Sequence, residues 1–139
     1  HGFLNDTLAL YDGLFASVEF KKHYDPAVSQ VRLDPEQMKR VMINLVDNAI
    51  EAMGRSGTIV IETMRDKSNS LVRIVVADTG PGIPAAERDK LFLPYYSTKG
   101  RGSGLGLAIV RRIVAEHGGS IDVTDNVPTG TRFIIELPA

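Results

Sequence analysis

The sequence predicts an α/β fold, a two-layer α/β sandwich in which a mixed, mostly antiparallel sheet is covered on one face by helices. Asp34-Pro35-Glu36 is a strong helix start, because an acidic N-cap precedes a proline at the first helical position. Apolar residues then recur with a period near 3.6 up to Met53. Two strand patterns follow, at residues 58–64 and 71–77, separated by a short polar turn that is typical of a β-hairpin. This mixed order of helices and hairpins favours a helical layer packed on a largely antiparallel sheet.

The other elements are predicted from shorter patterns of apolar, β-branched and glycine residues. Each is bounded by Gly, Pro, Asn or Asp, which interrupt regular structure. They are a weak helix within residues 3–14, an exposed strand at 17–24, a short helix at 85–92, a helix at 104–117 closed by Gly118-Gly119, and strands at 120–124 and 132–137 around a turn.

Length and composition restrict the classes of function. The 139 residues suit one domain, and the formal net charge of −1 gives no general electrostatic case for binding nucleic acid or an anionic membrane. The chain has no cysteine, which excludes disulfides and thiolate chemistry, and no apolar run long enough to span a membrane. We expect residues 1–14 to be a linker or the end of a preceding helix, and residues 15–139 to form the domain.

Two asparagines interrupt the pattern of strong helix-forming residues in the segment that follows Pro35. Asn44 and Asn48 are four residues apart and therefore share a face. They are either solvated amides at the polar edge of an amphipathic helix or oxygen ligands for Mg²⁺, a hard cation that prefers such donors.

An acidic residue followed by a glycine-rich turn comes directly after the apolar strand ending at Ala77. The Asp78 carboxylate is suited to accept a hydrogen bond from an exocyclic amine such as that of adenine, and Gly80 and Gly82 would let the backbone pass close to a flat ring. Asp78 to Ile83 is equally consistent with an Asp-capped turn that has glycines at left-handed positions.

A second glycine-rich segment, residues 99–107, runs directly into a helical pattern. Free N–H groups and the partial positive charge of a helix N-terminus both suit phosphate, and Lys99 and Arg101 add charge at the same point. A flexible linker has a similar composition. The aromatic residues in 91–99 that precede it are either the base of a mobile lid or ordinary packing, and Gly130-Thr131 alone is only a turn.

The order of these motifs is more specific than any one of them. Over residues 30–138 it resembles the ATP-binding catalytic domain of histidine kinases, in the superfamily shared with gyrase, Hsp90 and MutL, which implies the Bergerat ATP-binding fold. The segment Leu91 to Lys99 is most similar to that of nitrogen-regulation sensor kinases of the NtrY and NtrB type. The ATP-binding residues that the resemblance implies are Asn44, Asn48, Asp78, Gly80, Gly82, Ile83, Lys99, Arg101, Gly102, Ser103, Gly104, Leu105, Gly106 and Thr131.

Within this set, the resemblance implies that Asn48 coordinates Mg²⁺ bridging the ATP phosphates, with Asn44 assisting. Asp78 would hold the adenine amine, Thr131 would support it through water, and the glycines of residues 102–106 would place N–H groups on the phosphates. Many family members also have a phosphate-binding lysine shortly after the position of Ala49. Residues 50–53 of this chain contain no lysine, so Lys99 or Arg101 would take over the contact with phosphate.

The resemblance also implies a reaction. Related ATPases have a glutamate base at the position of Asn44, and an amide cannot accept a proton at neutral pH. Transfer of the γ-phosphate to a histidine on a separate dimerisation domain is therefore favoured over hydrolysis. His1, His23 and His117 lack the acid-flanked helical context of an acceptor, so we expect this protein-histidine kinase fragment to be inactive in autophosphorylation without that domain.

The implied partners are ATP, Mg²⁺, the dimerisation domain of the same kinase and, indirectly, a response regulator. The expected location is the cytoplasm, in a full-length protein anchored in the inner membrane. The alternatives are a regulatory nucleotide-binding module without transfer activity and an ATPase of the gyrase or MutL kind.

Overall fold

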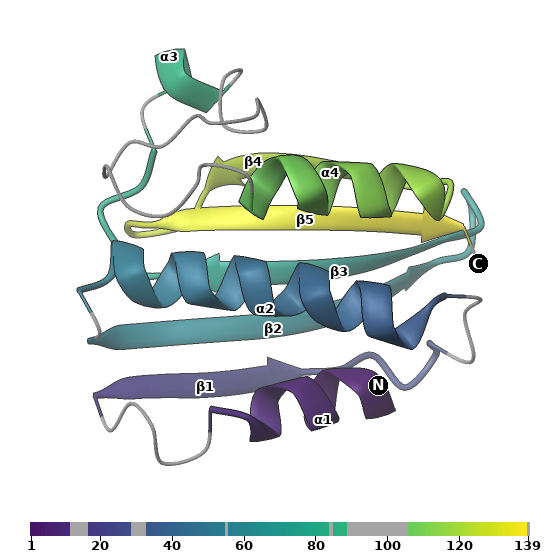
Figure 1. The fold of residues 1–139 in the computed structure, drawn as a ribbon, viewed down its shortest axis with the longest axis horizontal. Helices are drawn as coiled ribbons and strands as arrows, with labels where there is room; N and C mark the ends of the chain where they lie inside the picture. Colours follow the sequence, from purple (N-terminus) through teal and green to yellow (C-terminus); the bar gives the residue numbers. More distant parts are fainter. Residues whose placement is uncertain (12–16, 29–32, 55, 84, 89–105, 139) are drawn as a thin grey trace.

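The computed structural model describes residues 1–11, 17–28, 33–54, 56–83, 85–88 and 106–138 (Figure 1). None of the helices within these residues is long and apolar enough to cross a membrane. The elements are, in chain order, α1 (Gly2–Ala9), β1 (Val18–His23), α2 (Pro35–Ala52), β2 (Gly57–Asp66), β3 (Leu71–Asp78), α3 (Ala85–Arg88), α4 (Gly106–Glu116), β4 (Ser120–Asp125) and β5 (Thr131–Pro138).

The strands form one sheet in the order β1-β2-β3-β5-β4 (Figure 1). The pairs β2–β3, β3–β5 and β4–β5 are antiparallel, whereas β1 pairs with β2 in parallel. The parallel pair needs a crossover, and α2 supplies it. The predicted mixed, mostly antiparallel sheet is therefore confirmed, as is the hairpin that β2 and β3 form.

The helices α1, α2 and α4 lie over the same face of the sheet, with α2 between the other two (Figure 1). Alternate strand residues point toward them, since successive side chains in a strand face opposite sides. Ile59 and Ile61 of β2 and Ile135 of β5 are fully buried there. The α2 residues that meet them are Met38, Val41, Met42, Leu45, Val46, Ala49 and Ile50, at the 3.6-residue spacing read from the sequence.

The ends of α2 and α4 are defined by side-chain and glycine caps. The Asp34 carboxylate accepts hydrogen bonds from the N–H groups of Glu36 and Gln37, at 3.0 and 3.3 Å, so the predicted N-cap is confirmed. At the other helix, Gly118 has a φ of +74°. The N–H groups of Gly118 and Gly119 donate to the carbonyls of Ala115 and Val114, which is a Schellman C-cap.

His117 joins these two helix ends. Its Nε2 accepts from the Asp34 N–H at 2.9 Å, and its Nδ1 lies 2.8 Å from the carbonyl oxygen of Ile113. Because a backbone N–H only donates, the ring carries its proton on Nδ1 and donates it to Ile113. The start of α2 and the end of α4 are thereby held together beside the sheet.

The first helix is packed into the same core. Leu4 and Leu8 of α1, and Tyr11 just beyond it, belong to the buried cluster that includes α2. Nε2 of His1 is hydrogen-bonded to Oγ1 of Thr63 at 2.8 Å, and the His1 ring stacks on Tyr24 with 4.6 Å between centroids. The N-terminal residues therefore contact both the helical layer and the sheet.

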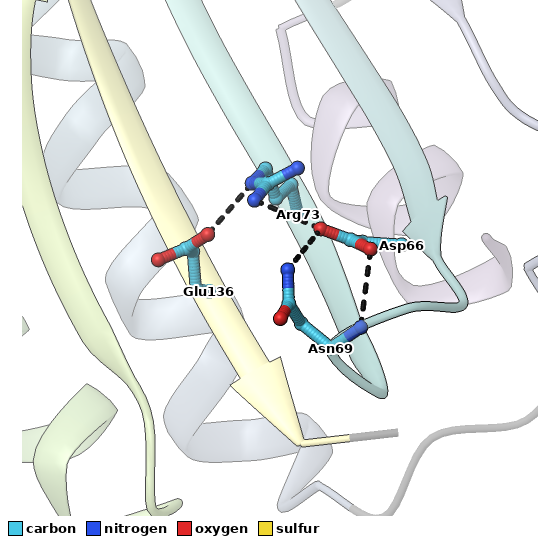
Figure 2. Close-up of polar contacts among 4 residues, drawn as sticks. All are labelled: Asp66, Asn69, Arg73 and Glu136. Atoms are coloured by element: carbon cyan, nitrogen blue, oxygen red, sulfur yellow. Dashed lines mark hydrogen bonds and ion pairs between the residues drawn. The ribbon is translucent and has the colours of Figure 1, made fainter.

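A charged network ties three strands together where β2 ends and β3 begins (Figure 2). Arg73 donates from Nε to Glu136 at 2.6 Å and from Nη2 to Asp66 at 3.1 Å. Asn69, in the intervening turn, donates to the same Asp66 carboxylate from its side chain and its backbone N–H. The opposite end of β3, at Asp78, carries the candidate site.

Candidate functional site

Asp78 is the last residue of β3, and its side chain is held in place by two backbone groups. The residue is only 3% exposed, next to the start of β5. Its Oδ1 accepts from the Gly80 N–H at 2.9 Å and from the Thr131 N–H at 3.3 Å. Two backbone donors of this kind fix the orientation of the carboxylate. Two residues predicted for the site, Gly80 and Thr131, therefore contact a third, Asp78.

The turn between β4 and β5 lies directly against the end of β3. A Cβ atom on Gly130 would be 1.9 Å from the carbonyl oxygen of Asp78, and the φ of Gly130 is +116°, so only glycine fits without strain. Nδ2 of Asn126 donates to the same carbonyl at 2.7 Å. The backbone of Asp78 is thus held by the turn, while its side chain is held by Gly80 and Thr131.

The segment from Asp78 to Ile83 runs between α2 and this turn. A Cβ atom on Gly80 would lie 3.1 Å from the carbonyl oxygen of Ala52, and one on Gly82 would lie 3.2 Å from that of Gly130. Ile83 packs against the edge of the core. These close backbone approaches give the glycines of the motif a structural reason, in addition to any contact with a ligand.

Arg88 of α3 links the same segment to β4. Its Nη2 donates to the carbonyl oxygen of Ile83 at 3.3 Å and forms an ion pair with Asp125. No sequence signal marks this arginine, because its partners are a backbone carbonyl and a residue 37 positions away. The same holds for Asn126, so both were missed by the sequence analysis.

The second part of the site lies where α2 faces the start of α4. A Cβ atom on Gly106, the first residue of α4, would be 3.6 Å from Oδ1 of Asn44, so these two predicted residues are neighbours. Asn44 is half-buried and Asn48, one turn further along α2, is exposed. Amide oxygens are hard donors, which fits Mg²⁺ shared with phosphates and water. No group of three His, Cys, Asp or Glu residues suited to a metal lies within the described part of the chain.

Asp47 lies between these two asparagines in the sequence. Its carboxylate is hydrogen-bonded to Tyr11, which follows α1, on the side of α2 away from α4 (Figure 1). Oη of Tyr11 donates to its Oδ1 at 2.7 Å. Burial raises the pKa of Tyr11, and the hydrogen bond to Asp47 and the charge of that carboxylate raise it further, so the phenol stays protonated. The predicted residues Lys99, Arg101, Gly102, Ser103, Gly104 and Leu105 lie outside the described residues.

Known proteins are similar to this chain over most of its length. Residues 33–139 match the family described as histidine kinase-, DNA gyrase B-, and HSP90-like ATPase. The sensor histidine kinase ZraS of Klebsiella oxytoca is 42% identical over 113 residues, which are 81% of this chain and 24% of the relative. The sensory histidine kinase/phosphatase NtrB of Escherichia coli O157:H7 is 36% identical over 131 residues, which are 88% of this chain and 37% of the relative.

Solved structures give the same result for the fold. The nucleotide-free catalytic domain of histidine kinase ThkA superposes with a TM-score of 0.88 at 36% identity, covering 99% of this chain and 92% of that one. ThkA in complex with the response regulator protein TrrA superposes with a TM-score of 0.84 at 34% identity, covering 99% of this chain and 39% of that one.

The chain therefore belongs to the family of histidine kinase-, DNA gyrase B- and HSP90-like ATPases. Within it, the chain is an ATP-binding catalytic domain of the sensor histidine kinase class, and the predicted similarity to NtrB-type kinases is confirmed alongside a similarity to ZraS. It spans only 24% of the length of that ZraS and 37% of the length of that NtrB.

Proposed function

We propose that this domain binds Mg-ATP at the Asp78 end of the sheet and presents the γ-phosphate to a histidine on a separate dimerisation domain. The observation that carries the proposal is the Asp78 carboxylate, buried at the end of β3 and oriented by two backbone N–H groups. A preorganised acceptor in a low-dielectric site discriminates strongly for a ligand amine. The proposed adenine end therefore consists of Asp78, Gly80, Gly82, Ile83 and Thr131.

The proposed phosphate end lies where α2 meets the start of α4. Asn48 would hold Mg²⁺ through its amide oxygen, with Asn44 beside it, and the neighbouring Gly106 supports this placement of the phosphates. The metal, when bound, neutralises charge on the phosphates. Lys99, Arg101, Gly102, Ser103, Gly104 and Leu105 complete the proposed set from the segment that leads into α4.

The proposed reaction is phosphoryl transfer rather than hydrolysis. A histidine ring nitrogen of the partner domain would attack the γ-phosphorus, so that a P–N bond forms and the P–O bond to ADP breaks. The proton of the attacking ring would pass to solvent water. Asn44 cannot act as a base toward water, because an amide does not accept a proton at neutral pH. Positioning and charge neutralisation would be the contributions of this domain, as is general for phosphoryl transfer.

Partners and domain boundaries follow from the same proposal. The acceptor domain would precede this one in the same kinase, with residues 1–14 as the end of the preceding helix and residues 15–139 as the catalytic domain in the cytoplasm. Leu4, Leu8 and Tyr11 pack that end onto the core of the domain. A response regulator would receive the phosphate afterwards. The ThkA complex with TrrA supports this type of partner, since it is the complex of a related kinase.

The proposal is tested first by titration with a fluorescent ATP analogue in the presence of Mg²⁺. We expect saturable binding by the unmodified chain and weaker Mg-dependent binding by Asn48→Ala. Gln37→Ala is the matched control, because Gln37 is an exposed amide on the first turn of the same helix. The absence of saturable binding to the unmodified chain would refute the proposal.

The transfer step is tested separately with radiolabelled ATP. We expect no label on the chain alone, and label on a separately produced dimerisation domain of the same kinase when the two are mixed. A chain that binds Mg-ATP but never labels its cognate acceptor would be a regulatory nucleotide-binding module. Release of inorganic phosphate without any acceptor would instead identify an ATPase.

A further inference from the structure

A buried tyrosine contacts α2 next to the proposed phosphate end of the site. Oη of Tyr11 donates to Oδ1 of Asp47 at 2.7 Å, between residues 36 positions apart in the sequence. Tyr11 is 8% exposed, and the centroid of its ring lies 5.8 Å from the ring centroid of Phe20 in β1. The hydroxyl is therefore held by packing, whereas the Asp47 side chain is exposed, so a hydrogen bond from a fixed donor can select its rotamer.

Asp47 occupies a sensitive position on α2. It follows Asn44 by three residues and directly precedes Asn48. Residues three apart on a helix are surface neighbours, with Cβ atoms about 5–6 Å apart. A carboxylate at this position, turned toward Asn44, would repel a polyphosphate and compete with it for Mg²⁺.

The donor and the proposed phosphate end lie on opposite sides of α2. Tyr11 follows α1, which lies on one side of α2, and Gly106 begins α4 on the other side, where it is adjacent to Asn44 (Figure 1). The hydrogen bond from Tyr11 thus draws the negative charge of Asp47 toward α1 and away from Asn44.

We propose that Tyr11 is a positioning residue for the phosphate end of the nucleotide site, acting through Asp47. This inference rests on the proposed function. It makes the affinity for the triphosphate depend on the placement of α1, since the hydroxyl reaches Asp47 only while α1 is packed against α2. We expect the adenine end to be unaffected, because the Asp78 carboxylate is held by the N–H groups of Gly80 and Thr131.

The test uses Tyr11→Phe, which keeps the buried ring and removes the donor. Isothermal titration calorimetry of the 139-residue chain with Mg-ATP and with adenosine separates the two ends of the site. We expect the affinity for Mg-ATP to fall roughly three- to tenfold, as for a unit charge moved by a few ångström near an anion, and the affinity for adenosine to stay the same. A purely structural role would weaken both or neither.

A double variant tests whether the charge of Asp47 causes the loss of affinity. In Tyr11→Phe/Asp47→Asn the carboxylate charge is gone, so the affinity for Mg-ATP should return to that of the unmodified chain. Tyr24→Phe is the matched control, because Oη of Tyr24 is buried with no hydrogen-bond partner among the described residues. It should leave both affinities unchanged.

The outcomes separate the two proposals. Equal Mg-ATP affinity for the unmodified chain and Tyr11→Phe, or failure of the double variant to restore it, would overturn the role of Tyr11 and leave the proposed function standing. No binding of Mg-ATP by the unmodified chain would overturn the proposed function itself.

Discussion

Gly130 lies so close to the end of β3 that a Cβ atom on it would be 1.9 Å from the carbonyl oxygen of Asp78. Gly130→Ala must therefore separate the β4–β5 turn from β3 and also place alanine at a φ of +116°. We expect a loss of unfolding free energy of about 1–3 kcal/mol or more, together with weaker nucleotide binding.

Urea denaturation measures this loss, with Gly2→Ala as the control because a Cβ atom there meets nothing within 4 Å. Equal stability of Gly130→Ala and the unmodified chain would show that the turn can move away from β3 without cost.

Asp78→Asn tests the adenine contact without removing the side chain. The amide oxygen can still accept from the N–H groups of Gly80 and Thr131, so the fold should be retained. Loss of the charged acceptor should weaken ATP binding by about 1–3 kcal/mol. Calorimetric titration gives the change, and Asp122→Asn, an exposed carboxylate on β4, is the control. Unchanged affinity would remove Asp78 from the adenine site.

The N-cap of α2 should contribute measurably to stability. Asp34→Ala removes the acceptor for Glu36 and Gln37 and should lower the free energy of unfolding by about 1 kcal/mol. Asp34→Asn keeps a side-chain oxygen and should lose much less. The backbone N–H that binds His117 is present in both variants, so a difference between them in urea denaturation reports the cap alone.

Tyr11 should make the fold sensitive to alkaline pH. Burial, reinforced by Asp47, raises its pKa in the folded state above the usual value of about 10. Below about pH 10 the phenol is protonated in both states and this contribution to stability is complete; above it only the unfolded state ionises, so stability falls. Tyr11→Phe should therefore lose less stability than the unmodified chain as pH rises above about 10. Identical pH profiles would contradict this.

The network in Figure 2 should make the stability of the fold depend on pH in the acidic range, without affecting nucleotide binding. Hydrogen bonds from the Asn69 side chain, then its backbone N–H and Arg73, lower the pKa of Asp66. The ionised form is favoured in the folded state, so the contribution is present above about pH 4 and is lost as pH falls. Asp66→Asn should show a flatter acid stability profile in circular dichroism, with unchanged Mg-ATP affinity at pH 7. Weaker nucleotide binding would show coupling along β3.

Local patterns were sufficient for most elements of this fold. The cap at Asp34 and the 3.6-residue period predicted α2, and the alternating patterns predicted β2 and β3 to within a few residues. The parallel direction of β1 was not predicted, because pairing depends on where α2 returns the chain rather than on β1 itself.

The site was predictable to the extent that its motifs are local. Asp78, Gly80 and Thr131 were named from the sequence, and the structure places them in contact. Asn126 and Tyr11 were not named as part of a site, because a single side-chain hydrogen bond to a distant residue leaves no periodicity or spacing to detect.

The position of β1 also has a consequence for shortened fragments of this chain. A fragment that began at residue 33, just before the cap of α2, would contain every proposed ligand-binding residue but no β1. The edge of β2 from Gly57 to Glu62 would then present unpaired N–H and C=O groups to solvent. Such an edge is a template for pairing with another chain, so we expect the shorter fragment to aggregate at lower concentrations than the longer one.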